Sequence, residues 1–312
     1  MENNFRSILA IDFETANAAR SSACAVAAVK MDLSGNVIES YYSLINPHEE
    51  FDPFNIMIHG ITPDDVVDSP SINPAMAKVF NLIDPDTLIV CHNSAFDFSV
   101  MKNSLSKEPL SIPDLTFTCT YRLSSRLISS LVSYTLPDVA DYLQIGGLDH
   151  HNAMSDALTC GKILLRLASD FSGDFGQMHT AANLKYGHIV DGDYDGIHKI
   201  NREHTGHISR LPKNFPDIIT GEDSPFYQKN VCFTGKLESM TRIEAIDIIN
   251  QIGGVGQDSF KKDTDYLITG YQSPSVLAGK PKSSKTLKAE EMLKKGKRIE
   301  IIPEDEFLKM LY

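Results

Sequence analysis

The chain lacks several features that define other protein classes. Tryptophan is absent from all 312 residues. No apolar run approaches the roughly 18 residues of a membrane-spanning helix. The amino terminus, MENNFRSILAIDF, has no basic region, long apolar run and small-residue cleavage site, so it does not resemble a signal peptide. We therefore expect a cytoplasmic protein without membrane contact.

Cysteine is scarce, and its spacing is uninformative for metal binding or disulfides. The five cysteines are an odd number, and none forms a C-x-x-C pair. Free cysteine packs as a small hydrophobic residue in reduced compartments. We expect reduced, buried thiols.

Positive charge is also in short supply, with 29 Lys and Arg against 41 Asp and Glu and a net charge of −12. The imbalance is uneven: residues 229–312 hold 14 basic and 12 acidic side chains, a net charge of +2, whereas residues 1–228 hold 15 and 29, a net charge of −14. An acidic region is compatible with nucleic acid when it holds divalent metals, because the metals then supply the positive charge.

Apolar patterning divides the chain into three parts. Residues 6–169 alternate strand and helix patterns, which indicates an α/β domain with a mixed sheet and helices on it. Residues 170–228 are rich in Gly, Asp, His and Pro, and we expect a linker there, either unstructured or with local order, because a loop of that length is unusual inside one domain. Residues 229–312 begin a second, small α/β domain.

Within the first part, the expected elements follow from apolar runs and turn residues. Strands are expected at 7–13, 24–33, 37–47 and 87–93, and helices at 69–83, 95–105, 135–143 and 153–171.

Acidic side chains occur at the ends of these elements. Asp12 and Glu14 end the first strand, and because side chains alternate along a strand they face the same side. Asp97 follows a buried strand, among apolar residues where an acid needs a partner or a metal. His151 lies on the loop before the last long helix, and Asp156 lies one turn inside that helix.

Each of these residues has an ordinary interpretation when taken alone. The first pair would be surface acids on a half-exposed strand. Asp97 would be an acid at a helix amino terminus, which the helix dipole favours. His150 and His151 would cap the next helix. The order and spacing of the set are what indicate a shared metal site.

The set resembles the DEDDh exonucleases, the family of the proofreading epsilon subunit of bacterial DNA polymerase III, over roughly residues 6–169. The sequence Asp-Phe-Glu-Thr-Ala-Asn, from Asp12, is similar to the variant in epsilon-like exonucleases. A sister class has Tyr four residues before the last Asp, where this chain has Asn152. The resemblance therefore implies the histidine class and a ribonuclease H-like fold.

The resemblance implies a chemistry and a set of roles. Two Mg²⁺ or Mn²⁺ ions, about 4 Å apart, would serve hydrolysis of a phosphodiester at a 3′ end. Asp12, Glu14 and Asp156 would hold one ion, Asp12 would share the second with the substrate phosphate, and Asp97 would act through water. His151 would take the proton from the attacking water.

The resemblance also suggests contacts to the terminal nucleotide. The segment His59-Gly60-Ile61-Thr62 matches one that lies near this nucleotide in the family. The expected substrate-binding residues are Phe13, Thr15, His59, Ile61 and Phe96. Both phenylalanines can equally be plain core residues.

Residues 229–312 resemble a BRCT domain, nearest to the one in bacterial NAD-dependent DNA ligase. The resemblance rests on the runs Asn230–Leu237, Gly253-Gly254 and Lys262–Ile268. Many BRCT domains have Trp in the last helix, and we expect Phe307 to fill that place. Thr234, Gly235 and Lys285 form a predicted phosphate site of donor groups, helix dipole and cation, which Arg242 joins by resemblance. Lys280, Lys282, Lys285 and Lys288 would add attraction to a nucleic-acid backbone.

The function that we expect is a 3′→5′ exonuclease acting on single-stranded or frayed DNA 3′ ends in replication or repair. Its BRCT domain would bind a DNA 5′ phosphate or a replication or repair protein. Two alternatives stay open: an RNA-trimming exonuclease, because the acidic site does not choose the sugar, and a non-catalytic scaffold whose BRCT domain binds a phosphorylated partner or a DNA end.

Overall fold

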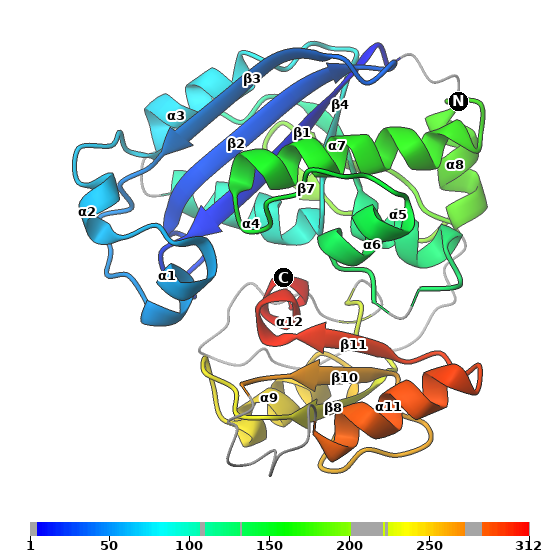
Figure 1. Cartoon of the computed structure of the whole chain (residues 1–312). Helices are drawn as coiled ribbons and strands as arrows, with labels where there is room; N and C mark the ends of the chain where they lie inside the picture. The colour runs from blue at the N-terminus through cyan, green and yellow to red at the C-terminus, as the bar shows by residue number, and fades with distance from the viewer. Residues whose placement is uncertain are drawn as a thin grey trace. The chain divides into compact units, whose positions relative to one another are not determined.

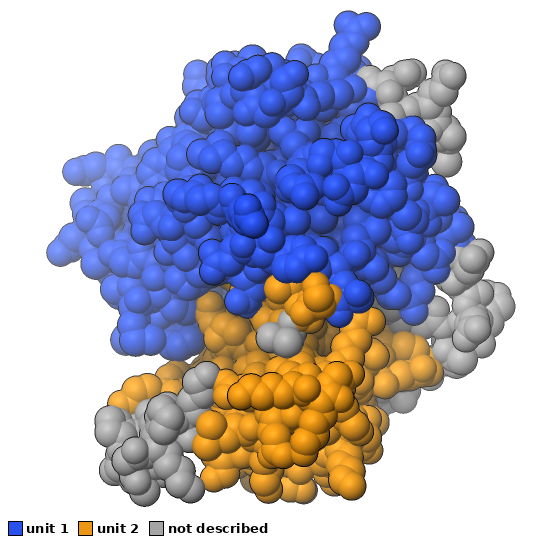
Figure 2. Space-filling view, turned by 45° about the vertical axis from the view of Figure 1, so that its right-hand side comes forward, with its two compact units in different colours: residues 1–129, 136–202 blue, residues 130–135, 203–312 orange. Residues whose placement is uncertain are grey.

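The computed structural model describes residues 5–106, 110–131, 133–200, 221, 224–271 and 283–311. The chain forms two compact units, which Figure 2 shows in different colours. Unit 1 comprises residues 1–129 and 136–202, and unit 2 comprises residues 130–135 and 203–312. No helix in the described part of the chain is long and apolar enough to cross a membrane.

A mixed sheet organises unit 1. Among the described residues it has seven strands in the order β3-β2-β1-β4-β5-β6-β7. Pairing is parallel at its centre, between β1, β4 and β5, and antiparallel on either side. The strands are β1 (Ser7–Thr15), β2 (Ala23–Asp32), β3 (Val37–Leu44), β4 (Thr87–Cys91), β5 (Leu115–Cys119), β6 (Gly187–Val190) and β7 (Asp193–Asp195).

Helices cover both faces of this sheet, which is why β1, β2 and β4 are buried almost throughout. Figure 1 shows α7 in front of the sheet and α3 and α4 behind it. The helices of unit 1 are α1 (Pro53–His59), α2 (Pro63–Val66), α3 (Ile72–Phe80), α4 (Ser94–Leu105), α5 (Thr120–Leu127), α6 (Leu136–Tyr142), α7 (Ala153–Ser169) and α8 (Phe175–Ala182). The mixed α/β class expected from the sequence is confirmed.

The long helix α7 packs against the sheet at a glycine. A Cβ atom at Gly161 would come within 2.7 Å of Met31 Sδ and 3.5 Å of Ala10 Cβ, so the glycine permits the approach. α7 thereby packs directly on β1 and β2. This packing brings the first turn of α7 to the carboxyl end of β1, where the acidic residues lie.

Unit 1 continues past residue 169, into the range that we expected to be a linker. The helix α8 buries Phe175 and Met178, and β6 pairs with β5. Asp191 and Gly192 both have positive φ, 53° and 82°, as a tight hairpin turn between β6 and β7 requires. The richness in Gly and Asp that indicated a linker therefore reflects hairpin turn chemistry in this part. Residues 201–220 of the expected linker lie outside the described residues.

Unit 2 contains a parallel sheet with four described strands in the order β11-β10-β8-β9. The strands are β8 (Asn230–Thr234), β9 (Val255–Gln257), β10 (Tyr266–Thr269) and β11 (Glu300–Pro303), and the helices are α9 (Arg242–Gln251), α11 (Ser284–Lys294) and α12 (Glu304–Met310). Phe307 of α12 is fully buried, with its ring centroid 5.6 Å from that of Phe226 and 5.4 Å from that of Phe233. It occupies the core, as expected for a residue that replaces Trp.

Candidate active site

The carboxyl end of β1 presents two carboxylates on one side of the strand. Glu14 is 5% exposed, and Asp12 is half-buried. β4 lies beside β1 in parallel, so the carboxyl ends of both strands meet at the same edge of the sheet. Two carboxylates in such a buried place repel each other unless a cation or a proton lies between them.

Asp156 lies in the first turn of α7 and is 3% exposed. Its Oδ2 accepts hydrogen bonds from Nδ1–H of His150 and from the backbone N–H of His151, each at 3.1 Å. Its Oδ1 is buried, and no hydrogen-bond donor among the described residues reaches it. A buried acceptor without a donor is costly, and a bound cation would satisfy it.

The structure brings Asp12, Glu14 and Asp156 together. Each offers an oxygen, and the three oxygens lie within 4.8 Å of one another. Hard oxygen ligands are those that Mg²⁺, Mn²⁺ and Ca²⁺ prefer. The acceptor Oδ1 of Asp156 and the shared negative charge thus fit a divalent cation.

Asp97 is not among these three, although it belongs to the same region. It lies in the first turn of α4 and is 2% exposed. Burial raises the pKa of the Cys91 thiol, and the charge of Asp97 and, more weakly, that of Asp12 raise this pKa further. Both carboxylates therefore lie near the end of β4. Asp97 is thus buried near this end of the sheet, but it is not one of the three carboxylates whose oxygens lie within 4.8 Å of one another.

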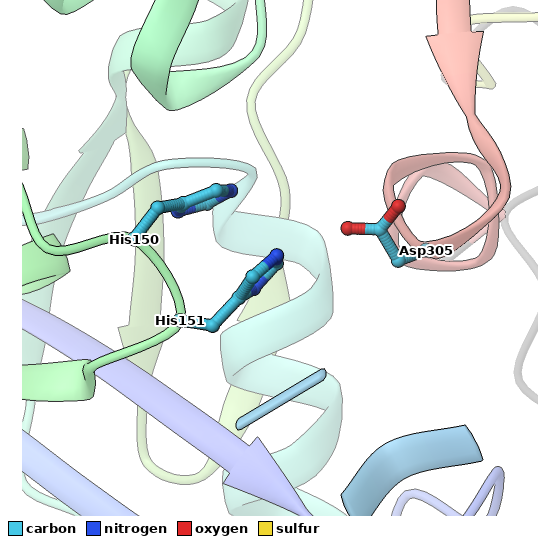
Figure 3. Close-up of side chains that lie close together, drawn as sticks. All are labelled: His150, His151 and Asp305. Carbon is cyan, nitrogen blue, oxygen red and sulfur yellow. The ribbon is translucent and has the colours of Figure 1, made fainter. Parts of the chain in front are cut away.

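His151 lies directly beside Asp156. Its backbone is left-handed, with a φ of 67°, an uncommon conformation for a side-chain-bearing residue. Figure 3 shows its ring against that of His150, with centroids 3.8 Å apart and planes 26° from parallel. The cap of α7 is Asn152, whose side chain accepts the N–H of Ser155. The two histidines therefore do not serve as the helix cap.

The residues predicted to contact the terminal nucleotide differ in how exposed they are. Phe13 is 2% exposed and Phe96 6% exposed, and the guanidinium of Arg20 lies 4.3 Å from the centroid of the Phe96 ring. Most of the surface of both phenylalanines is thus already covered by protein. Ile61 is partly exposed.

His59 holds the backbone at the end of β1. Its Nδ1 accepts the N–H of Ile61 at 3.0 Å, so the ring proton is assigned to Nε2, which donates to the carbonyl oxygen of Thr15 at 3.1 Å. Nδ2 of Asn55 donates to the same carbonyl at 2.8 Å. These bonds fasten α1 to β1 one residue beyond Glu14.

Two residues of this region had no predicted role. Asn55 gives no signal in the sequence, because its importance depends on where α1 lies. His150 gives a weak one, as the first member of a histidine pair of which the motif uses only the second. The structure shows that His150, rather than His151, donates a side-chain hydrogen bond to Asp156.

In unit 2, the four predicted phosphate-binding residues hydrogen-bond mainly within the domain. Thr234 Oγ1 donates to Ser283 Oγ at 2.9 Å, and Lys285 Nζ donates to the carbonyl of Phe233 at 2.7 Å. Arg242 donates to the carbonyl of Gly235 at 2.9 Å, and both of these residues line a surface pocket. Gly235 and Arg242 thus line one pocket, whereas the ammonium group of Lys285 is hydrogen-bonded to the backbone of β8. Lys280 and Lys282 lie outside the described residues.

A mixed sheet with a buried carboxylate group at the carboxyl ends of its central strands defines an α/β protein with a candidate metal centre. The exonuclease family model, RNase_T, matches residues 9–164, which is half of the chain, and the chain belongs to this family. The model of the BRCA1 C Terminus (BRCT) domain matches residues 221–310.

Curated relatives match the first domain. A DNA polymerase III PolC-type protein of Thermotoga maritima is 28% identical over 141 residues, which cover 45% of this chain and 10% of that protein. A 3′-5′ exonuclease DinG of Bacillus subtilis is 29% identical over 142 residues, covering 46% of this chain and 15% of that protein. The match thus spans a small part of these relatives. The narrower likenesses, to epsilon-like exonucleases and to the ligase BRCT domain, stay predictions.

Solved structures also align with this region. Exonuclease X in complex with 5′-overhanging duplex DNA is 22% identical, with a TM-score of 0.47, and the alignment covers 56% of this chain and 99% of that one. The nuclease domain of 3′hExo, a DEDDh family member bound to rAMP, is 14% identical, with a TM-score of 0.48 and coverage of 56% and 97%.

Proposed function

We propose that this chain is a metal-dependent 3′→5′ exonuclease that removes nucleotides from DNA 3′ ends. One observation carries the proposal: the oxygens of Asp12, Glu14 and Asp156 lie within 4.8 Å of one another in a chain of the exonuclease family. His151 lies next to this group, with its N–H on Asp156. This arrangement of the acids and the histidine supports the proposed phosphodiester hydrolysis.

The proposed cofactor is a pair of Mg²⁺ or Mn²⁺ ions. Asp12, Glu14 and Asp156 would hold one ion, Asp12 would share the second with substrate, and Asp97 would contribute through water. Bound ions supply positive charge where negative charge develops on the phosphate and on the departing oxygen.

The side chains have distinct proposed tasks. The His151 imidazole accepts a proton from the attacking water, a task that histidine side chains commonly perform in enzymes. Thr15, Ile61 and His59 border the terminal nucleotide, and His59 does so by fixing the backbone of the other two. Phe13 and Phe96 would form apolar walls through the little surface that they expose.

DNA is the proposed substrate class, with replication or repair proteins as partners. Two features support it: relatives of the first domain are named as DNA polymerase III PolC-type proteins, and a BRCT domain is attached. In unit 2, Gly235 and Arg242 line one pocket and are proposed to bind a DNA 5′ phosphate, together with Thr234 and Lys285. Such binding should weaken steeply with salt.

The test uses matched DNA and RNA oligonucleotides, with free or blocked 3′ ends, incubated with Mg²⁺ or Mn²⁺. We expect stepwise shortening of DNA from a free 3′ end and none from a blocked one. Preference for RNA would support the trimming alternative instead. Absence of cleavage, with retained binding of a phosphorylated partner, would support the scaffold.

Asp12→Asn is the decisive variant, because it removes a charged ligand with little change in volume. We expect nuclease activity to become undetectable and Mn²⁺ binding to weaken strongly. Asp64→Asn, an exposed acid in α2, is the matched control and should leave both unchanged. Full activity of Asp12→Asn would contradict the proposed site.

The second domain is tested on DNA with a 5′ phosphate or a 5′ hydroxyl. Arg242→Gln should reduce binding only to the phosphorylated end, whereas Arg298→Gln, another exposed arginine of unit 2, should not distinguish the two ends. Equal binding of both ends by the unchanged chain would reject the phosphate site.

A further inference from the structure

His150 contacts both the carboxylate and the histidine of the candidate site. Its Nδ1 lies 3.1 Å from Oδ2 of Asp156, and its ring stacks on that of His151 with centroids 3.8 Å apart. The two imidazoles lie face to face in Figure 3. The site as proposed above gives this residue no task.

The hydrogen bond determines which oxygen of Asp156 is available. A carboxylate has two equivalent oxygens, and rotation about its last bond exchanges them. Oδ2 accepts two hydrogen bonds, from His150 and from the His151 backbone, whereas Oδ1 is buried without a donor among the described residues. Asp156 is therefore held with one oxygen occupied and the other open.

The ring contact between His150 and His151 matters also because the backbone of His151 has an unfavourable conformation. A φ of 67° costs free energy, and such a conformation persists only when its surroundings fix it. His151 donates its backbone N–H to Oδ2 of Asp156, and its imidazole stacks on the ring of His150. The ring contact limits where the His151 imidazole can point.

We propose that His150 is a positioning residue: it holds Oδ2 of Asp156, so that Oδ1 is the oxygen offered to a divalent cation, and its ring supports the imidazole of His151. The metal and base roles that it supports rest on the proposed function. His150 itself donates through Nδ1 and need not change its charge.

Two substitutions separate the two contacts. His150→Asn places an amide N–H near the position of Nδ1 and removes the ring. His150→Phe keeps a planar ring for the stack and removes the donor. His48→Phe, at an exposed histidine of unit 1, is the matched control.

The primary readout is Mn²⁺ binding by titration calorimetry at one fixed pH on the full chain, which needs no nuclease activity. We expect His150→Phe to bind Mn²⁺ about 10–100-fold more weakly, the usual effect of losing a partner of a metal ligand. His150→Asn and His48→Phe should bind like the unchanged chain. Unchanged affinity of His150→Phe would overturn the positioning of Asp156.

The second readout is turnover at saturating Mn²⁺, where the loss of metal affinity no longer matters. His150→Asn should then have the lower kcat, because His151 has lost its ring support, with KM for the oligonucleotide little changed. Equal kcat for His150→Asn and the unchanged chain would overturn the support of His151.

Failure of this inference is distinguishable from failure of the proposed function. If the unchanged chain binds no Mn²⁺, the metal site itself is wrong. If it binds Mn²⁺ and His150→Phe binds equally well, only the role of His150 is wrong. His150→Gln, whose amide reaches the Nε2 position instead, repeats the donor test without a bulky ring, and wild-type affinity there would again contradict the proposal.

Discussion

His179 is a histidine that the fold keeps uncharged. It is 3% exposed, and its Nε2 lies 2.9 Å from Thr118 Oγ1 on β5. Its ring packs on that of Tyr186, with centroids 3.9 Å apart. Burial lowers its pKa to about 4, because the charged form loses its hydration. The uncharged side chain thus joins α8 to β5 of the sheet.

This burial predicts a loss of stability in mild acid. The unfolded chain takes up a proton near pH 6.5, whereas the folded chain does so only near pH 4, so folding is penalised as pH falls through that window. From pH 8 to pH 5 the contribution of His179 is about 2 kcal/mol of destabilisation. Urea unfolding of the unchanged chain and His179→Gln at both pH values measures it. The variant should lose less stability between them, and equal losses would contradict the assignment.

Substitution of His151 tests its proposed role as the base. Replacing it with Ala removes the proposed base but none of the three clustered carboxylates, so turnover should fall about 10²–10⁴-fold while Mn²⁺ binding changes little. Single-turnover cleavage and calorimetry measure the two effects. The backbone N–H bond to Asp156 is retained in this variant. Full turnover would assign the proton transfer to another group.

The pairing of strand β6 with strand β5 depends on Gly187, which has no side chain. Gly187 faces the ring of Phe117, and an added Cβ would lie 2.2 Å from the ring atom Cζ. Phe117 is fully buried, and its ring stacks on that of Tyr194, with centroids 5.5 Å apart. The ring therefore has little room to retreat.

We expect Gly187→Ala to destabilise unit 1 by about 1–3 kcal/mol through this overpacking. Gly146→Ala is the control, since no atom lies within 4 Å of its added Cβ and its φ is not positive. Thermal unfolding measures both. A stabilised Gly187→Ala would show that β6 does not lie on Phe117.

Comparison of the predicted with the observed helices and strands shows which elements a local sequence pattern can predict. β1 and β4 are short apolar runs and α7 is a long amphipathic segment, and all three match their predictions closely. The elements α1, β6 and β7 are only three to seven residues long, too short for periodicity to appear. They are held by distant partners such as the Thr15 carbonyl and the edge of β5, which no local pattern encodes.

At the scale of the whole molecule, the extent of the first folding unit can be tested by truncation. A chain ending at residue 200 keeps α8, β6 and β7, whereas one ending at 169 loses them and uncovers Phe117 and the edge of β5. We expect the longer piece to unfold cooperatively and the shorter one to be much less stable. Similar melting temperatures would instead support a domain that ends at residue 169.

The sequence by itself determined the carboxylates and their order. Alternation along a strand is a local property, so Asp12 and Glu14 had to share a face, and Asn152 before Asp156 favoured the histidine class. Only the tertiary structure decided which acids meet. Asp156 joins the first pair because α7 packs on β1, whereas Asp97 is not among the three carboxylates whose oxygens lie within 4.8 Å of one another. His150 is the side-chain donor to Asp156 because of the conformation of the loop before α7, which the sequence pattern did not specify.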